Sequence, residues 1–140
     1  MLNKEDIMNI LPHRDDMLLV EEIEVIDEET CIGRYTVKGN EFFLNGHFPG
    51  NPIVPGVIQC EMMAQSACGL FKDKMEDALP VYTGINNVKF KRQVKPGETI
   101  SFKCQITRSK HPFYFFKGQA SVDGEVCMTG EFSFALLANK

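Results

Sequence analysis

The stretch that decides the fold runs Pro55-Gly-Val-Ile-Gln-Cys-Glu-Met-Met-Ala-Gln-Ser-Ala-Cys-Gly-Leu-Phe71. It predicts a helix over residues 56–71, because prolines gather at helix starts and Pro55 stands just before the run. Apolar side chains occupy nearly every side of this helix, and a helix of that kind is normally buried. The rest of the chain must therefore cover it.

Most of the remaining chain is strand-like. Residues 17–26 are predicted to form a strand, because acidic residues alternate there with Val20, Ile23 and Val25, and residues 31–37 fit its neighbour. Turn sequences stand at residues 95–98 and at Asp123-Gly124, the second being a two-residue hairpin signal. Four more strands are predicted over residues 81–90, 99–108, 113–122 and 125–136. One buried helix with about six strands fits an α+β fold, an antiparallel sheet wrapped around the helix.

A short helix is expected at the start of the chain. Asn3 is a suitable cap, Asp6 stands three residues later in the position of a capping box, and Pro12 marks the end of the helix. Residues 41–55 follow the second strand with several prolines and glycines, so they are expected to form an ordered loop with fixed backbone angles.

Composition narrows the class of protein. A chain of 140 residues suits one domain, residues 1–140, and 44% hydrophobic with 24% charged residues is typical of a globular protein. The polar start is unlike a signal peptide, and the chain has no apolar run long enough to span a membrane. Five cysteines without a CxxC pair argue against disulfides and a zinc site. Reduced thiols in the cytoplasm are expected.

The charge distribution is uneven. A net charge of −4 argues against general affinity for nucleic acid. Residues 89–95 nevertheless carry four cations and no acid, namely Lys89, Lys91, Arg92 and Lys95. This basic segment is either the solvated face of a strand or a docking surface for an acidic partner.

Glu61 is the least expected residue of the predicted helix. A carboxylate in a buried helix is costly unless it is paired, protonated or hydrogen-bonded. It is either a functional acid or a side chain that reaches solvent near the positive end of the helix dipole. Gln65 stands four residues later on the same face and is within reach of a hydrogen bond to Glu61.

His47 lies in the loop just before that helix. A single histidine in such a loop either satisfies backbone carbonyls or acts on a ligand. A neutral imidazole and a carboxylic acid on opposite sides of a substrate would serve as general base and general acid, with neither a metal nor a cofactor. The sequence has no GxSxG elbow, no GxGxxG or P-loop, and its three histidines lack the spacing of metal ligands.

A family resemblance rests on the segment from Gly46 to Gln65, which contains Gly46-His-Phe-Pro-Gly-Asn-Pro-Ile-Val-Pro-Gly-Val57 and Glu61-Met-Met-Ala-Gln65. It resembles the signature of the 3-hydroxyacyl-acyl carrier protein dehydratases of the FabZ type. Leu11-Pro-His-Arg14, Gly84-Ile-Asn-Asn-Val-Lys-Phe-Lys-Arg92 and Pro96-Gly97 also resemble motifs of that family. Asp15-Asp16 departs from the pattern, which usually has less acidic residues there.

The resemblance implies a hot-dog fold, in which an antiparallel sheet wraps around a long central helix. It implies homodimers, commonly assembled as trimers of dimers, and a substrate held on the phosphopantetheine arm of acyl carrier protein. The catalytic residues implied are His47 and Glu61, facing each other from different subunits. The dehydratase/isomerase type generally has aspartate at the second position, so isomerisation is not expected here.

A mechanism follows from these roles. His47 takes a proton from C2, Glu61 protonates the leaving hydroxyl, and the Gly56 amide at the helix start receives charge from the thioester oxygen. Burial is expected to raise the pKa of Glu61. Val57, Gln65 and Phe48 are further substrate-binding candidates, Phe43 and Met62 are candidates for an acyl tunnel or for ordinary core, and the basic segment 89–95 would dock the acidic carrier protein.

Two other functions remain open from the sequence. One is a hot-dog thioesterase, which must activate water against the thioester. The other is a non-catalytic acyl-thioester sensor, which would not need both His47 and Glu61. Acyl-chain length and the choice between fatty-acid and polyketide pathways are not readable from these motifs.

Overall fold

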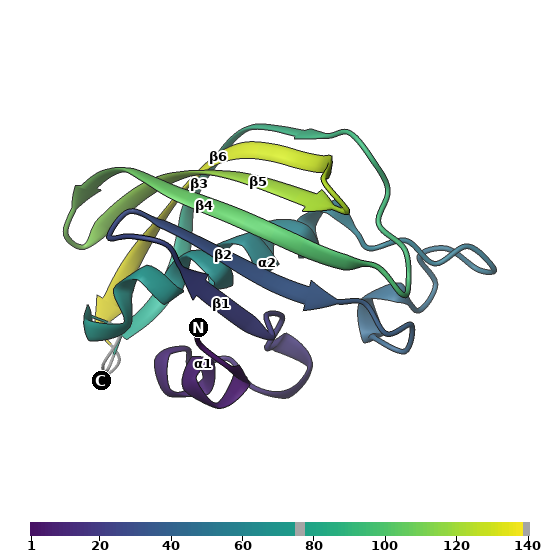
Figure 1. The fold of residues 1–140 in the computed structure, drawn as a ribbon, viewed down its shortest axis with the longest axis horizontal. Helices are drawn as coiled ribbons and strands as arrows, with labels where there is room; N and C mark the ends of the chain where they lie inside the picture. Colours follow the sequence, from purple (N-terminus) through teal and green to yellow (C-terminus); the bar gives the residue numbers. More distant parts are fainter. Residues whose placement is uncertain (75–77, 139–140) are drawn as a thin grey trace.

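One antiparallel sheet covers one central helix (Figure 1), in a computed structural model that describes residues 1–74 and 78–138. The strands follow the order β1-β2-β4-β5-β6-β3 across the sheet. They are β1 (Glu22–Val25), β2 (Thr30–Thr36), β3 (Ala78–Phe90), β4 (Thr99–Lys110), β5 (Phe113–Val122) and β6 (Glu125–Ala138). The helices are α1 (Lys4–Ile10) and α2 (Gly56–Ala67), with 3₁₀ turns η1 (Asp15–Met17), η2 (Phe42–Leu44) and η3 (Cys68–Lys74). The predicted sheet around a central helix is confirmed.

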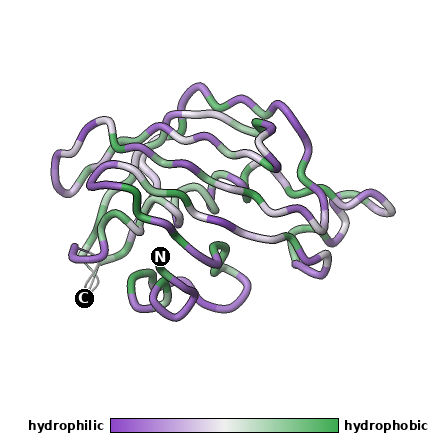
Figure 2. The backbone as a smooth tube through the Cα atoms, in the orientation of Figure 1, coloured by the Kyte–Doolittle hydropathy of each residue, from purple (hydrophilic) through white to green (hydrophobic). Residues whose placement is uncertain are grey.

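The core lies between α2 and the inner face of the sheet. Met62 and Met63 of α2 are fully buried, and along the strands hydrophobic and hydrophilic residues alternate (Figure 2), as expected for a sheet with one covered face. Glycines permit the close approach: a Cβ on Gly33 would lie 2.0 Å from the Ser66 hydroxyl oxygen, and one on Gly118 would lie 2.6 Å from the Met63 sulfur. The sheet therefore wraps tightly around α2.

The predicted strand over residues 17–26 is wrong in extent. Only β1 is extended and paired, Met17 belongs to η1, and the buried residues 18–20 lie outside the sheet. The cause is a side chain of α2: the Gln65 carboxamide accepts a hydrogen bond from the Leu19 N–H at 2.8 Å and donates one to the Met17 carbonyl at 2.8 Å. These backbone groups are thereby satisfied without a neighbouring strand.

The predicted helix over residues 56–71 ends earlier as an α-helix. It stops at Ala67 and continues as η3, within which Phe71 leaves helical angles. Gly69 lies in this stretch, where a Cβ would come within 2.7 Å of Ile23. Glycine both permits that contact with β1 and weakens the continuation of an α-helix.

The remaining boundaries follow the sequence closely. The Asn3–Asp6 capping box is present, and α1 ends before Pro12. β5 has the predicted bounds, while β2 is shifted by one residue and β3, β4 and β6 extend by two or three residues. Asp123 and Gly124 both have positive φ, as their hairpin requires. None of the described helices has the length and apolarity needed to cross a membrane.

The strand β3 forms one edge of the sheet and carries exposed apolar side chains. It spans 13 residues and pairs with β6 on one side only. Ile85 is 48% exposed, and Val57 at the start of α2 is 77% exposed. A long edge strand with exposed apolar side chains is a template for pairing with another chain.

Candidate active site

The loop between β2 and α2 holds His47 by its backbone and its ring. The His47 N–H donates to the Leu44 carbonyl at 3.0 Å, and the His47 carbonyl accepts from the Ile53 N–H at 2.9 Å. The ring Nδ1 lies 3.0 Å from the Ile53 carbonyl oxygen, which can only accept. Nδ1 therefore carries the proton, and a neutral ring presents its lone pair on Nε2, as a general base requires.

His47 opens onto a pocket of about 640 Å³. Gly56, Val57 and Phe90 line it together with His47. As the first two residues of α2, Gly56 and Val57 have N–H groups without an acceptor inside the helix, so they suit a developing negative charge. A Cβ on Gly56 would lie 2.6 Å from the Phe90 ring, so a larger residue there would push Phe90 aside. The remaining lining residues are Ile53, Val54, Pro55, Gln59, Lys91, Arg92 and Gln93.

Glu61 is fixed by two side chains. The Gln65 amide donates to Glu61 Oε2 at 2.9 Å, so the predicted contact between these residues is confirmed. Gln65 is itself oriented by its bonds to the backbone of Met17 and Leu19. The His13 Nε2 lies 3.4 Å from the same Glu61 oxygen. These contacts therefore hold the Glu61 carboxyl group in a fixed orientation.

The pKa of Glu61 is lower than expected from burial alone. Burial of the carboxyl group raises its pKa, but the hydrogen bonds from His13 and Gln65 and the attraction of His13 outweigh that effect. The pKa of Glu61 therefore lies below the ordinary value for a glutamate. The prediction of a raised pKa is thus wrong for the single chain, because the side chain is still 27% exposed and has two partners that favour its carboxylate.

His47 and Glu61 do not share a pocket within one chain. Glu61 lines a separate small hollow of about 30 Å³, room for roughly one water molecule. The residues around that hollow are His13, Ala64, Gln65, Cys68, Pro80, Val81, Tyr82 and Phe134. The two predicted catalytic groups thus line separate hollows in the single chain.

The other predicted site residues are spread more widely. Phe48 is half exposed and stacks on His47 with ring centroids 4.1 Å apart, but it does not line the His47 pocket. Met62 and Phe43 belong to the hydrophobic core and line neither hollow, so they are poor candidates for a tunnel wall.

The four cations of the basic segment differ in their positions and contacts. Lys91 is exposed and lies at the His47 pocket, whereas Lys89 and Lys95 are exposed outside it. Arg92 also lines the pocket, but its guanidinium is bound by two carboxylates, Glu98 and Glu125. Arg92 is therefore largely neutralised and Lys91 carries the free charge at the rim.

Three residues near the site were not assigned a role from sequence: His13, Gln59 and Phe90. His13 belongs to the Leu11-Pro-His-Arg14 motif, and the Arg14 guanidinium fixes that turn by donating to the Leu11 and Met8 carbonyls at 2.7 and 2.9 Å. The contact between His13 and Glu61 joins residues 48 positions apart, so only the fold reveals it.

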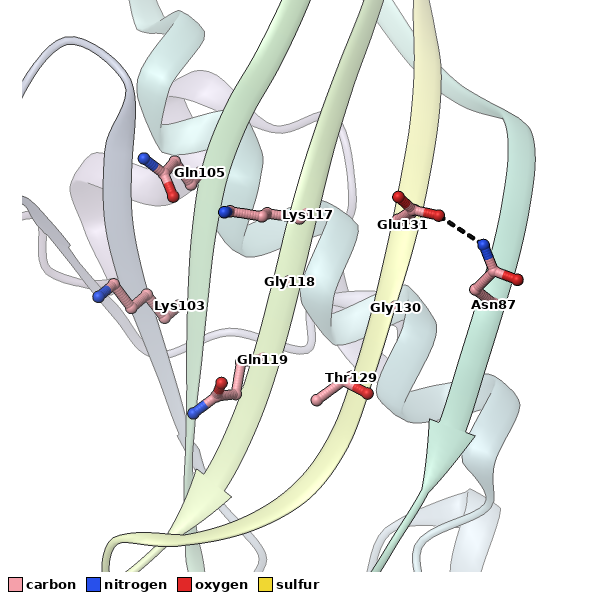
Figure 3. A pocket seen from close by; sticks show the side chains of 9 residues that line it. All are labelled: Asn87, Lys103, Gln105, Lys117, Gly118, Gln119, Thr129, Gly130 and Glu131. Atoms are coloured by element: carbon pink, nitrogen blue, oxygen red, sulfur yellow. Dashed lines mark hydrogen bonds between the residues drawn. The ribbon is translucent and has the colours of Figure 1, made fainter.

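Another hollow lies on the outer face of the sheet (Figure 3). Its side chains are polar and come from four neighbouring strands, and Asn87 donates a hydrogen bond to Glu131 at 2.6 Å. Its lining includes Lys103, Gln105, Lys117, Gln119 and Thr129. It contains no histidine and lies away from α2, so we assign it to the solvated face. Within residues 1–74 and 78–138, no three metal-binding side chains gather in one place.

Comparison with known proteins extends over almost the whole chain. A family model described as a FabA-like domain matches residues 11–131. A protein of Acetivibrio thermocellus is 42% identical, with 98% of this chain and 96% of the relative covered. Proteins of Petrotoga mobilis (41%; 93% and 94% covered) and Clostridium beijerinckii (40%; 97% and 99% covered) are similar to the same extent. All three are named 3-hydroxyacyl-[acyl-carrier-protein] dehydratase FabZ.

Solved structures agree on the fold. The dehydratase heterocomplex ApeI:P of Xenorhabdus doucetiae superposes with a TM-score of 0.80 at 23% identity, covering 93% of this chain and 90% of that one. A protein of Streptococcus pneumoniae described as a hypothetical thioesterase with coenzyme A gives a TM-score of 0.62 at 13% identity, covering 84% of this chain and 85% of that one. These likenesses support the predicted hot-dog fold. The chain therefore belongs to the FabA-like family, and within it to the FabZ-type 3-hydroxyacyl-[acyl-carrier-protein] dehydratases.

Proposed function

We propose that this chain removes water from (3R)-3-hydroxyacyl thioesters carried on acyl carrier protein, giving trans-2-enoyl thioesters in fatty acid biosynthesis. The observation that carries the proposal is the match to FabZ dehydratases at about 40% identity over nearly the whole length of both chains. We infer that the reaction takes place in the cytoplasm.

His47 is the base in this reaction. Its Nδ1–H is held by the Ile53 carbonyl, so the free Nε2 lone pair takes a proton from C2 of the substrate. As the C2–H bond breaks, electron density moves toward the thioester carbonyl oxygen. The Gly56 amide at the start of α2 stabilises that charge, with help from the helix dipole and the adjacent Val57 N–H.

Glu61 is the acid. It transfers its proton to the C3 hydroxyl, the C3–O bond breaks, water leaves, and the C2–C3 double bond forms. His13 and Gln65 favour its carboxylate in the free chain. Substrate binding removes water from the carboxyl group and shifts its pKa upward, which supplies the protonated form. The carboxylate is the form needed in the reverse direction, where it takes a proton from water.

Each complete site is formed by two chains. Within one chain His47 and Glu61 line separate hollows, and the exposed edge of β3 beside the Glu61 hollow is free to pair with a second copy. A twofold dimer joined there would produce two equivalent sites, each with His47 of one chain facing Glu61 of the other. We infer a homodimer as the working unit and a trimer of dimers as the larger assembly.

Acyl carrier protein docks at the basic rim. Lys91 lies at the mouth of the His47 pocket, with Lys89 and Lys95 nearby on the basic segment. An acidic carrier would be steered there by charge and would deliver its arm past Phe90. Arg92 organises the rim through Glu98 and Glu125.

Product analysis tests the activity directly. The protein is incubated with a (3R)-3-hydroxyacyl-acyl carrier protein, and the products are followed by mass spectrometry and by free-thiol release. Dehydration lowers the mass of the acyl carrier by one water without releasing thiol. Release of free thiol would instead indicate a thioesterase, and saturable binding without either product would indicate a sensor.

A further inference from the structure

Gln59 is a buried side chain with an unmet hydrogen-bonding group. It is 3% exposed, and its Oε1 has no hydrogen-bond partner within the part of the chain that the structure describes. Its Nε2 donates only a long bond of 3.4 Å to the Val54 carbonyl. That bond identifies the nitrogen side of the carboxamide, so the unpaired group is an acceptor that needs an O–H or N–H donor.

The location of Gln59 indicates where the donor comes from. Gln59 lines the same pocket as His47 and Gly56, the two groups that act on the thioester. The Val54 backbone beside it is fixed by a 2.9 Å bond from its N–H to the Val94 carbonyl. Buried acceptors are normally satisfied, and an exception at the wall of a substrate pocket points to the substrate.

The carboxamide of Gln59 is weakly restrained. The terminal torsion of glutamine is broad, and the single 3.4 Å bond to Val54 restrains it weakly. A rotation about this torsion would reorient Oε1 relative to the pocket that Gln59 lines without moving the aliphatic part of the side chain. The cost of the unpaired acceptor in the free protein is then recovered when ligand binds.

We propose that Gln59 is a substrate-binding residue whose Oε1 accepts a hydrogen bond from a donor on the bound acyl-pantetheine. This deepens, and rests on, the proposed dehydratase function. Two groups near the thioester carry such a donor: the C3 hydroxyl and the pantetheine amide closest to the sulfur. A bond from the hydroxyl hydrogen would leave an oxygen lone pair facing the general acid, which would orient the leaving group before C–O cleavage.

Binding of unreactive ligands tests this without depending on turnover. S-(3R)-3-hydroxyalkyl pantetheine is a thioether whose C2 protons are not acidic, and it is compared with S-alkyl pantetheine, which lacks the hydroxyl. A third ligand replaces the amide N–H nearest the sulfur by an ester oxygen. The three affinities are measured by calorimetry for the wild type, Gln59→Met and the matched control Gln119→Met, an exposed glutamine on the outer face of the sheet.

The expected result is a loss confined to Gln59→Met. The wild type and Gln119→Met should prefer a ligand with the relevant donor by about tenfold, and this preference should vanish in Gln59→Met. Disappearance of the hydroxyl preference identifies the hydroxyl as donor, and disappearance of the amide preference identifies the amide. The Tm of unliganded Gln59→Met should equal or exceed that of the wild type, because the substitution removes an unpaired buried acceptor.

Other results overturn the inference. If Gln59→Met keeps both ligand preferences of the wild type, Oε1 does not contact the substrate. If the variant loses subunit association instead, the acceptor belongs to an interface. If the wild type binds none of the three ligands, the proposed function fails together with the inference, whereas normal binding with an unaltered Gln59→Met profile overturns the inference alone.

Discussion

At the scale of single residues, the orientation and charge of the Glu61 carboxyl group are set by two neighbouring side chains. Glu61 is held by Gln65 at 2.9 Å and by His13 at 3.4 Å, and both contacts favour the carboxylate. A group whose pKa is lowered in the folded chain stabilises the fold above its unfolded pKa. That stabilisation is lost as the pH falls through the lower, folded pKa.

Replacing His13 should therefore change the titration of Glu61. In His13→Ala the carboxylate loses a hydrogen bond and an attractive charge, so the pKa of Glu61 should rise relative to the wild type. Carbon-13 NMR of glutamate-labelled protein measures the midpoint, with the signal assigned by its absence in Glu61→Gln. His111→Ala is the matched control, because His111 contacts Tyr114 and not Glu61. An unchanged Glu61 midpoint in His13→Ala would refute the assigned role of His13.

The sequence was informative about residue types and less so about their surroundings. His47 and Glu61 were both identified as candidates from a loop and a helix that adjoin in the chain. The contact between His13 and Glu61 was not predictable from their spacing in the sequence, because it depends on how η1 and the preceding turn fold against α2. The direction of the Glu61 pKa shift was predicted wrongly for the same reason.

At the scale of elements, β3 and the segment that follows it serve two purposes. The strand provides an exposed sheet edge, and its end leads into the rim of the His47 pocket. Arg92 ties this rim to Glu98 and to Glu125 of β6, so the exposed Lys91 next to it is presented in a fixed position. The sequence predicts a docking role for all four cations of this segment, but their contacts in the fold differ.

Reversing the charge of Lys91 should weaken carrier docking. Lys91→Glu should raise the KM for acyl-carrier substrate several-fold and reduce its salt dependence, since an attraction to the acidic carrier is lost. A short pantetheine thioester should show little change. Lys103→Glu, on the outer face of the sheet (Figure 3), is the matched control. Equal losses with both substrates would mean that Lys91 shapes the pocket instead of docking the carrier.

Most elements were predictable because their signals are local. Periodicity, caps and the Asp123-Gly124 hairpin located α1 and the strands to within a few residues. The predicted first strand is too long because the apolar run over residues 17–20 also suits a strand, whereas the Gln65 side chain binds the backbone of Met17 and Leu19 there. A side chain from a distant helix leaves no trace in local periodicity.

At the scale of the whole molecule, two features suit completion by a second chain. They are the exposed edge of β3 and the separate hollows lined by His47 and by Glu61. Ile85 is 48% exposed on β3, where edge-to-edge pairing would cover it. Ile85→Lys should block that pairing, because a lysine on an edge strand disfavours the approach of a second strand. Sedimentation should then show a smaller species than the wild type, with activity lost in parallel. Thr107→Lys, an exposed position on β4, is the control. Unchanged assembly in Ile85→Lys would exclude β3 as the joining edge.

The most direct test of a site shared by two chains is complementation between two inactive variants. His47→Ala and Glu61→Gln should each lose about 100-fold or more of dehydration activity while remaining folded. After random subunit exchange, half of the dimers are mixed, and each mixed dimer contains one intact site and one doubly defective site. The mixture should therefore recover about a quarter of wild-type activity, because the symmetric sites are independent. No recovery, although mass spectrometry shows mixed dimers, would contradict the account and place both residues of each site on one chain.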